Sequence, residues 1–136
     1  MKKVIWMICM TIALCSCNDS DDINEIFMNR NWTLSFFQEG TTRTPSPEKE
    51  NYIIRFYEGS FVASSTNGAE ITGNWIADNK TRDFACTNIR TNSKAESDAT
   101  AGKMTTFLRK ATHYEGDANW LKIKQTDNVY MQFYNR

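Results

Sequence analysis

The sequence predicts an α+β domain, with a mostly antiparallel β sheet or barrel of about eight strands and one helix packed against it. After residue 31, apolar residues mostly alternate with polar ones, which is the period of half-buried strands. One stretch, from Met104 to Ala111, instead has apolar residues at i, i+3, i+4 and i+7, which is the spacing of a helical face. The 136 residues suffice for one domain, and 16 basic residues balance 16 acidic ones, so we expect no nucleic-acid partner.

The first strand is expected at residues 32–37. Its core side is predicted to carry Trp32, Leu34 and Phe36. Residues 38–51 contain one glycine, two prolines and mixed charges, which predicts a long exposed loop.

A hairpin is predicted around Glu58-Gly59, between strands at residues 52–57 and 60–64. A two-residue turn there places Phe56 opposite Phe61 and aligns the apolar residues on one side. Two further strands are expected at residues 71–75, after the turn Asn67-Gly68, and at residues 83–90, after the turn Asp78-Asn79-Lys80. Phe84 and Cys86 share one face of the latter strand.

The helical stretch presents one apolar stripe, formed by Met104, Phe107, Leu108 and Ala111. Ser93 and Ser97 are candidate N-caps for it. Gly102 weakens the middle of the stretch, so the alternative is a helix that begins only there.

The C-terminal hairpin carries the candidate binding residues. A three-residue turn at residues 126–128 pairs Ile123 with Met131 and Leu121 with Phe133 on the core side. The same register pairs Trp120 with Tyr134, Lys122 with Gln132 and Lys124 with Tyr130 on the outside. We call this outer set the aromatic–lysine face: Trp120, Lys122, Lys124, Tyr130 and Tyr134. It is either ordinary cross-strand packing or a shallow platform for sugar rings or a protein partner.

Residues 1–16 are predicted to be a signal peptide rather than part of the fold. Lys2 and Lys3 precede an apolar run from Val4 to Leu14, and this run of about eleven residues falls short of the roughly twenty that cross a bilayer. The junction Leu14-Cys15-Ser16-Cys17 resembles the lipobox of bacterial lipoproteins. This resemblance implies cleavage before Cys17 and contact with the membrane through a lipid on its thiol.

Removing residues 1–16 from the 136-residue chain leaves 120 residues, with 14 basic and 16 acidic groups. Residues 17–30 are then an acidic tether and a short lead-in, in which Ser20 is a candidate helix cap before Ile23. The run Asn18 to Asp22 is either a solvated tether or, by resemblance, the surface-export signal of Bacteroidetes lipoproteins. We expect an outer-membrane lipoprotein exposed at the cell surface; the alternative location faces the periplasm.

Several short motifs occur in an order shared with one known family, with one spacing, from Thr81-Arg82 to Ala85-Cys86, a residue longer than usual. They are Trp32-Thr33-Leu34, the apolar strand and glycine at residues 54–59, Ile71-Thr72-Gly73-Asn74-Trp75, Thr81-Arg82 followed by Ala85-Cys86, and then Leu108, Tyr114, Gly116 and Leu121-Lys122-Ile123. Together they resemble the META domain of small heat-inducible bacterial envelope lipoproteins, with residues 31–136 as the META-like domain. The family's Gly-Cys-Asn signature should fall at Asn67-Gly68-Ala69, where neither a cysteine nor an asparagine stands in its place, and this puts any redox or binding role of that signature in doubt.

No catalytic or metal-binding constellation is found in the sequence. His113 is the only histidine, and Cys86, the only thiol left after lipidation of Cys17, is expected to be a buried and inert strand residue. A carboxylate pair for glycoside hydrolysis would have to come from acids scattered along the chain. These are Glu58, Glu70, Asp83, Glu96 and Glu115. We therefore expect no enzyme activity, no metal and no cofactor.

Two function classes remain. The META resemblance implies a non-enzymatic envelope lipoprotein that binds a protein or an envelope component. The alternative is a glycan-binding or glycan-processing accessory lipoprotein on the cell surface, which the acidic run and the aromatic content favour.

Overall fold

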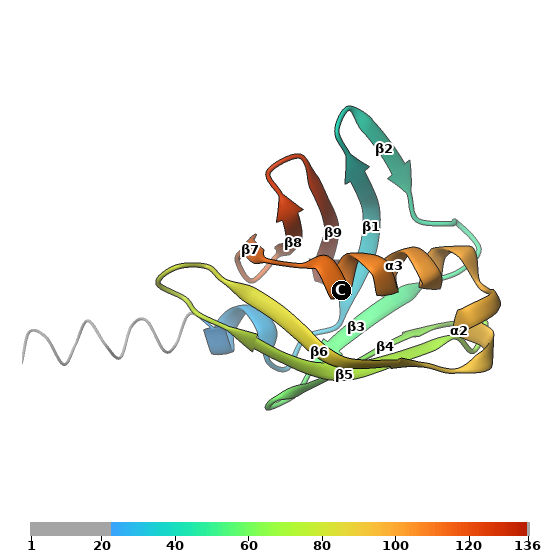
Figure 1. Ribbon diagram of the computed structural model, residues 1–136, viewed down its shortest axis with the longest axis horizontal. Coiled ribbons are helices and arrows are strands. Elements are labelled where there is room, and N and C mark those ends of the chain that lie inside the picture. The colour runs from blue at the N-terminus through green and yellow to red at the C-terminus, as the bar shows by residue number, and fades with distance from the viewer. Residues whose placement is uncertain (1–22, 136) are drawn as a thin grey trace, which may run out of the picture.

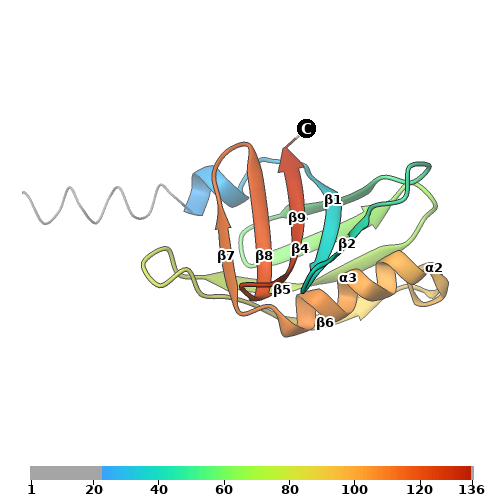
Figure 2. The ribbon, with the colours of Figure 1, turned by 90° about the horizontal axis from the view of Figure 1, so that it is seen from above.

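A computed structural model describes residues 23–135 as one antiparallel sheet curved into a half-barrel, with α3 lying between the two halves of the sheet (Figures 1 and 2). The strands are β1 (Trp32–Glu39), β2 (Thr42–Pro45), β3 (Tyr52–Phe56), β4 (Ser60–Ser65), β5 (Glu70–Ala77), β6 (Phe84–Thr91), β7 (His113–Gly116), β8 (Trp120–Thr126) and β9 (Val129–Asn135). The labelled helices are α2 (Ser93–Ser97) and α3 (Ala99–Lys110), and a short helix also covers residues 23–27. Within this part of the chain, no helix is both long and apolar enough to cross a bilayer.

The predicted fold class is confirmed. Eight strands follow one another in the order β6-β5-β4-β3-β1-β9-β8-β7, and β2 pairs with β1 outside this path. At the ends of the path, β6 and β7 meet through an isolated bridge between Asp83 and His113. The Phe84 amide donates to the Thr112 carbonyl at 2.9 Å and the Tyr114 amide to the Arg82 carbonyl at 3.0 Å. We call this junction between β6 and β7 the seam. The helix α3 packs against β6 and β8.

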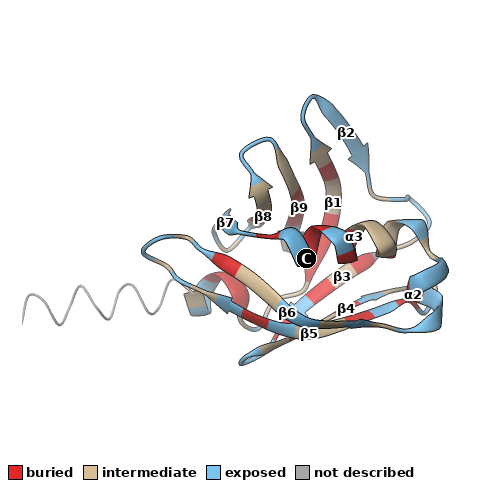
Figure 3. Cartoon of the chain, in the orientation of Figure 1, coloured by how far each residue is buried: buried red, intermediate tan, exposed pale blue. Residues whose placement is uncertain are grey.

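The core is built around Phe27, which is fully buried. Buried segments occur on α3 and on strands of both halves of the sheet (Figure 3). The ring centroid of Phe27 lies 5.0 Å from that of Phe56, 4.8 Å from that of Trp75 and 4.9 Å from that of Tyr114. The Trp32 indole donates to the Ile26 carbonyl at 3.0 Å and fixes the short helix to β1. The lead-in therefore contributes Ile26 and Phe27 to the folded core, and is more than a tether. Ser20, the candidate cap, lies outside the described residues.

The core side of the first strand is partly different from the prediction. Trp32 and Leu34 are buried as expected, but the register with β9 shifts between Leu34 and Phe36. The extra residue, Ser35, reverses the alternation, so Phe37 is buried and Phe36 lies outside. A β-bulge therefore explains why simple alternation fails at Phe36.

The predicted loop at residues 38–51 is also only partly correct. Gly40, at φ 64°, turns the chain back, and β2 pairs with the second half of β1. Pro45 ends β2, which is an edge strand. Proline is tolerated there because the outer side of an edge strand makes no hydrogen bonds to another strand.

Both predicted turns around β4 are confirmed. Tyr57 and Ser60 bracket a two-residue turn, Phe56 pairs with Phe61, and Ile54 pairs with Ala63. The Ser65 amide donates to the Ala69 carbonyl at 3.0 Å and closes the Asn67-Gly68 turn. The sequence reasoning missed β7, which is only four residues long.

The helical stripe is confirmed, but its caps are not the predicted serines. Asn92 caps α2 and Asp98 caps α3, each by accepting a hydrogen bond from a backbone amide three residues on. Ser93 and Ser97 lie inside α2, and Gly102 lies inside α3 rather than at its start.

Candidate functional site

The aromatic–lysine face forms in the predicted register. Trp120 pairs with Tyr134, Lys122 with Gln132, and Lys124 with Tyr130, while the apolar partners lie on the core side. The hairpin keeps this register with an extra residue between Lys124 and Thr126, so a bulge at Gln125 takes the place of the three-residue turn. Tyr134 is exposed, and the other four side chains are half-buried.

Aromatic rings and cations continue this face across four strands. The Lys122 ammonium nitrogen lies 4.6 Å from the ring centroid of Tyr130 and 5.7 Å from that of Trp120. Tyr130 meets Phe36 edge to face, with centroids 6.2 Å apart, and the Arg43 guanidinium carbon lies 3.9 Å over the Phe36 ring. We call this line of five side chains, from β2 to β8, the cation–aromatic ladder. Stacking of this kind holds long cationic side chains in place at a sheet surface.

The two cations of the ladder differ from Lys124 in their partners. Neither Arg43 nor Lys122 has a carboxylate within ion-pair distance among residues 23–135. Lys124 contacts Glu115 at 2.7 Å and Asp127 at 2.9 Å, and its side chain is only 11% exposed. Hydrogen bonds to Glu115 and then Asp127 raise the pKa of Lys124. Lys124 is thus committed to fixing β7 and the β8–β9 turn, which separates it from the rest of the predicted face.

Phe36 and Arg43 were missed by the sequence reasoning. Phe36 was assigned to the core because a bulge leaves no mark in simple alternation, and Arg43 was assigned to a loop. One signal for β2 was present: Gly40 separates Gln38-Glu39 from a segment in which β-branched Thr42 and Thr44 flank Arg43.

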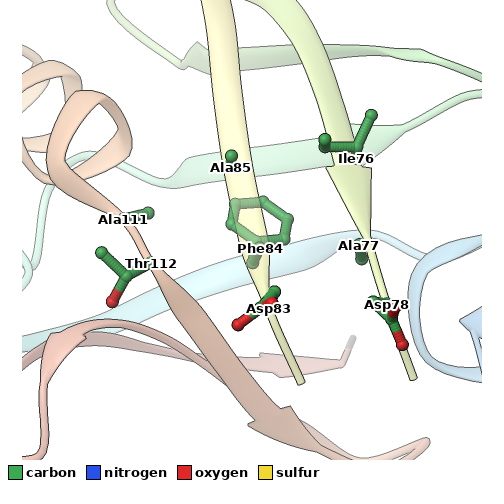
Figure 4. Close-up of a pocket in the computed structure, with 8 residues that line it drawn as sticks. All are labelled: Ile76, Ala77, Asp78, Asp83, Phe84, Ala85, Ala111 and Thr112. Atoms are coloured by element: carbon green, nitrogen blue, oxygen red, sulfur yellow. The ribbon is translucent and has the colours of Figure 1, made fainter. Parts of the chain in front are cut away.

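A second surface lies at the seam, where a mostly apolar hollow of about 580 Å³ opens beside β5 and β6 (Figure 4). Its lining residues are Ile76, Ala77, Asp78, Asp83, Phe84, Ala85, Ala111 and Thr112. Ile76 is 73% exposed, which is unusual for a large aliphatic side chain in a strand. A more polar hollow of about 410 Å³ adjoins it at Thr112, between β7 and the end of β8.

His113 at this seam lies between an acid and a hydroxyl. Its Nε2 lies 3.2 Å from Asp83, and its Nδ1 lies 3.0 Å from the Thr112 hydroxyl oxygen. The arrangement of carboxylate, imidazole and hydroxyl resembles a nucleophilic triad. The Thr112 hydroxyl, however, donates to the Gln125 carbonyl at 3.0 Å. Its proton therefore points away from the imidazole, unlike the proton of an activated nucleophile.

The other candidate catalytic groups are dispersed. Cys86 is half-buried against the core, and burial raises the pKa of its thiol to about 12, which is the opposite of nucleophile activation. Of the five scattered acids, Asp83 contacts His113 and Glu115 contacts Lys124, whereas Glu58, Glu70 and Glu96 lie at a hairpin turn, at the start of β5 and in α2. Among residues 23–135, no three acids, histidines or cysteines gather at a metal-binding spacing. Cys17 lies outside the described residues.

Comparison with known proteins decides the family. A family model described as "Domain of unknown function (DUF4847)" matches residues 18–135. The chain belongs to this family. The META resemblance is therefore wrong: most of its motifs lie in strands and turns of this fold, and such positions do not by themselves identify a family.

A solved structure supports the same fold. The DUF4847 domain resembles a crystal structure of a DUF4847 family protein from Bacteroides vulgatus ATCC 8482, with a TM-score of 0.63 and 24% sequence identity. The match covers 82% of this chain and 96% of that chain. No curated protein matches the sequence.

Proposed function

We propose that the chain is a non-enzymatic envelope lipoprotein, held in the outer membrane by a lipid on Cys17, whose DUF4847 domain binds a protein or another envelope component. The signal-like residues 1–16 and the Leu14-Cys15-Ser16-Cys17 junction support the anchor. The acidic run from Asn18 to Asp22 supports exposure at the cell surface, with the periplasmic side as the alternative.

The cation–aromatic ladder carries the binding proposal. Arg43 and Lys122 are held over rings without an acidic partner among the described residues, so their charge remains available to an anionic group. Because stacking has already ordered these side chains, a partner pays less conformational entropy on binding them. Aromatic residues and arginine also dominate the energetics of protein interfaces. We infer that the partner presents acidic groups to this face.

A glycan ligand is the second candidate. Trp120 and Tyr134 are cross-strand partners at the edge of the same face, and Tyr134 is 39% exposed. Neighbouring aromatic rings of this kind suit stacking on a sugar ring. Uncharged glycans would use this aromatic pair, whereas an acidic partner would depend on Arg43 and Lys122.

The absence of catalysis in this proposal rests on three contacts. The Thr112 hydroxyl donates to a carbonyl, burial raises the pKa of the Cys86 thiol, and Asp83 and Glu115 contact different side chains, His113 and Lys124. These observations support a domain without an activated hydroxyl or thiol nucleophile.

The binding proposal is tested with the soluble domain beginning at residue 18, titrated calorimetrically with acidic and neutral glycans and used to capture envelope proteins. Captured partners are then titrated with Arg43→Gln, Lys122→Gln and the pair Trp120→Ala/Tyr134→Ala. Lys94→Gln is the matched control, since Lys94 is an exposed lysine on α2. Loss of affinity in the two cation variants supports an acidic partner, and loss only in the aromatic pair supports the glycan candidate. A partner bound equally well by all three variants would contradict a role for this face.

The anchor is tested separately. Wild-type protein should take up labelled palmitate and float with membranes, while Cys17→Ser should do neither. Continued palmitate labelling of Cys17→Ser would disprove the assignment.

A further inference from the structure

One end of the domain combines exposed apolar side chains with the point where the chain enters the fold. We call it the N-terminal pole and define it by residues 23–24, 57–59 and 76–83. Of the three large apolar side chains that are exposed within the described range, Ile76 at 73% and Tyr57 at 47% lie here. Figures 1 and 2 both place the first described residues and the β5–β6 hairpin at the same end of the molecule, opposite α2.

Ile76 stands between two hollows. The apolar seam hollow of Figure 4 lies on one side of it, and a hollow of about 430 Å³ lies on the other. The second hollow is lined by Ile23, Asn24 and Met28 from the N-terminal segment, by Glu58 and Gly59 from the β3–β4 turn, and by Trp75, Ile76 and Ala77 from β5. The Trp75 indole donates to the Tyr57 carbonyl at 2.8 Å, which fixes the turn beside β5. Ile76 and Ala77 line both hollows and so join them into one surface, and the exposed Tyr57 lies on the turn that borders it.

The length of the chain before Ile23 limits what can lie against this surface. Cys17 is six residues before Ile23, and six residues reach at most about 22 Å at 3.3–3.6 Å each. A domain of this size has a radius of gyration near 13 Å. A lipid on Cys17 therefore holds the start of the fold near the bilayer. The reach of the six residues is shorter than the width of the domain, which is more than twice its radius of gyration.

The charges of the pole argue for an apolar rather than an electrostatic contact. Glu58, Asp78, Lys80 and Asp83 are exposed at the pole and Arg82 is half-buried, so the pole has no excess of positive charge. Attraction to anionic lipids needs clustered basic residues, whereas an exposed isoleucine and tyrosine suit the interfacial zone of any bilayer.

We propose that the N-terminal pole is a membrane-docking surface, on which Ile76 and Tyr57 enter the interfacial zone of the bilayer that holds the lipid of Cys17. This inference rests on the proposed anchor. It adds an orientation: β5 and β6 lie toward the membrane at their hairpin end, and α2 points away from it.

The test uses full-length lipidated protein in phosphatidylcholine vesicles, with a fluorophore at Lys80→Cys in the pole or at Lys94→Cys in α2. Both carry Cys86→Ala, so that only the introduced thiol is labelled. Lipids with quenching groups in the headgroup region should quench the Lys80 site several-fold more strongly than the Lys94 site. Adding anionic phosphatidylglycerol should not change that ratio.

Two further variants assign the effect to the apolar residue. Ile76→Ser should reduce quenching at the Lys80 site, while Tyr134→Ser, which removes an exposed aromatic residue from β9, should leave it unchanged. Equal quenching at both labelled sites in vesicle-bound protein would overturn the docking surface and leave the pole to a protein or small ligand. Failure of the wild-type protein to float with the vesicles would instead contradict the anchor, so the two failures are distinguishable.

Discussion

The Tyr52 hydroxyl donates to the carboxylate of Asp98, with oxygen distances of 2.8 and 3.0 Å, and so joins β3 to the junction between α2 and α3. The same carboxylate accepts the Asn67 amide at 2.6 Å and the Ala101 backbone amide at 3.0 Å. One acid therefore holds together a strand, a turn and the start of the main helix.

Replacing Asp98 by Ala should destabilise the domain by about 2–4 kcal/mol, because the change removes an N-cap and leaves buried donors without an acceptor. Tyr52→Phe should cost only about 1 kcal/mol, since it removes one hydrogen bond and keeps the ring. Urea unfolding of both single variants and the double variant measures the coupling between them. If the two losses simply add, the Tyr52–Asp98 hydrogen bond contributes nothing to stability.

The free energy of unfolding should also depend on pH, through the protonation of Asp98. Burial by itself raises the pKa of Asp98, but hydrogen bonds from Ala101, Asn67 and Tyr52 outweigh it and lower the pKa below its usual value. A folded-state pKa below the unfolded value of about 3.9 gives stability that is complete above that pH and is lost as pH falls through the folded pKa. We expect the free energy of unfolding to decrease from about pH 4 downward, and Asp98→Asn to have a shallower acid slope.

Asp127→Asn is the comparison for this pH series. The hydrogen bond and charge of Lys124 lower the pKa of Asp127, but Asp127 lies on an exposed turn. We expect Asp127→Asn to change the decrease of the free energy of unfolding with falling pH less than Asp98→Asn does. An Asp98→Asn slope equal to that of the wild type would contradict the assignment.

Two glycines should respond oppositely to a single methyl group. A Cβ at Gly73 would lie 2.7 Å from a ring carbon of Phe61 and 3.0 Å from the Thr87 carbonyl oxygen, whereas a Cβ at Gly102 would meet nothing within 4 Å. Gly73→Ala should therefore lower stability by about 1–3 kcal/mol. Gly102→Ala, inside α3, should raise it by about 0.5–1 kcal/mol. Denaturation midpoints of the two variants decide this, and equal midpoints would show that Phe61 can move aside at no cost.

Cys86 should react slowly with thiol reagents at neutral pH, because burial raises its pKa to about 12 and leaves almost no thiolate. Cys86→Ala should cost about 1–2 kcal/mol through a small cavity beside the core. A chromogenic disulfide reagent measures the rate on the native domain. Complete reaction within seconds would mean that the thiol is accessible.

The sequence predicted best where packing leaves one consistent choice. At the C-terminal hairpin, only one register puts Leu121, Ile123, Met131 and Phe133 on one side, and that register is the one observed. The same argument placed Phe56 opposite Phe61.

Prediction failed where one inserted residue or a distant partner decides the outcome. The bulge at Ser35 moves Phe36 to the outer face of the sheet, where it joins Arg43 to Tyr130 in the cation–aromatic ladder. Asn92 and Asp98, rather than Ser93 and Ser97, cap the helices, and spacing alone cannot resolve a shift of one residue. The burial of Phe27 depends on four aromatic residues that are distant in the sequence.

The position of Phe27 has a mechanical consequence. The short helix at residues 23–27 ends at Phe27, in the centre of the aromatic core. The Trp32 indole holds this helix by a hydrogen bond to the Ile26 carbonyl. Tension applied through the N-terminal end would thus load the middle of the core before it loads any strand pair. Extracting Phe27 would break its ring contacts with β3, β5, β6 and β7 together, so a pull from that end should unfold the domain in one step rather than peel the sheet strand by strand.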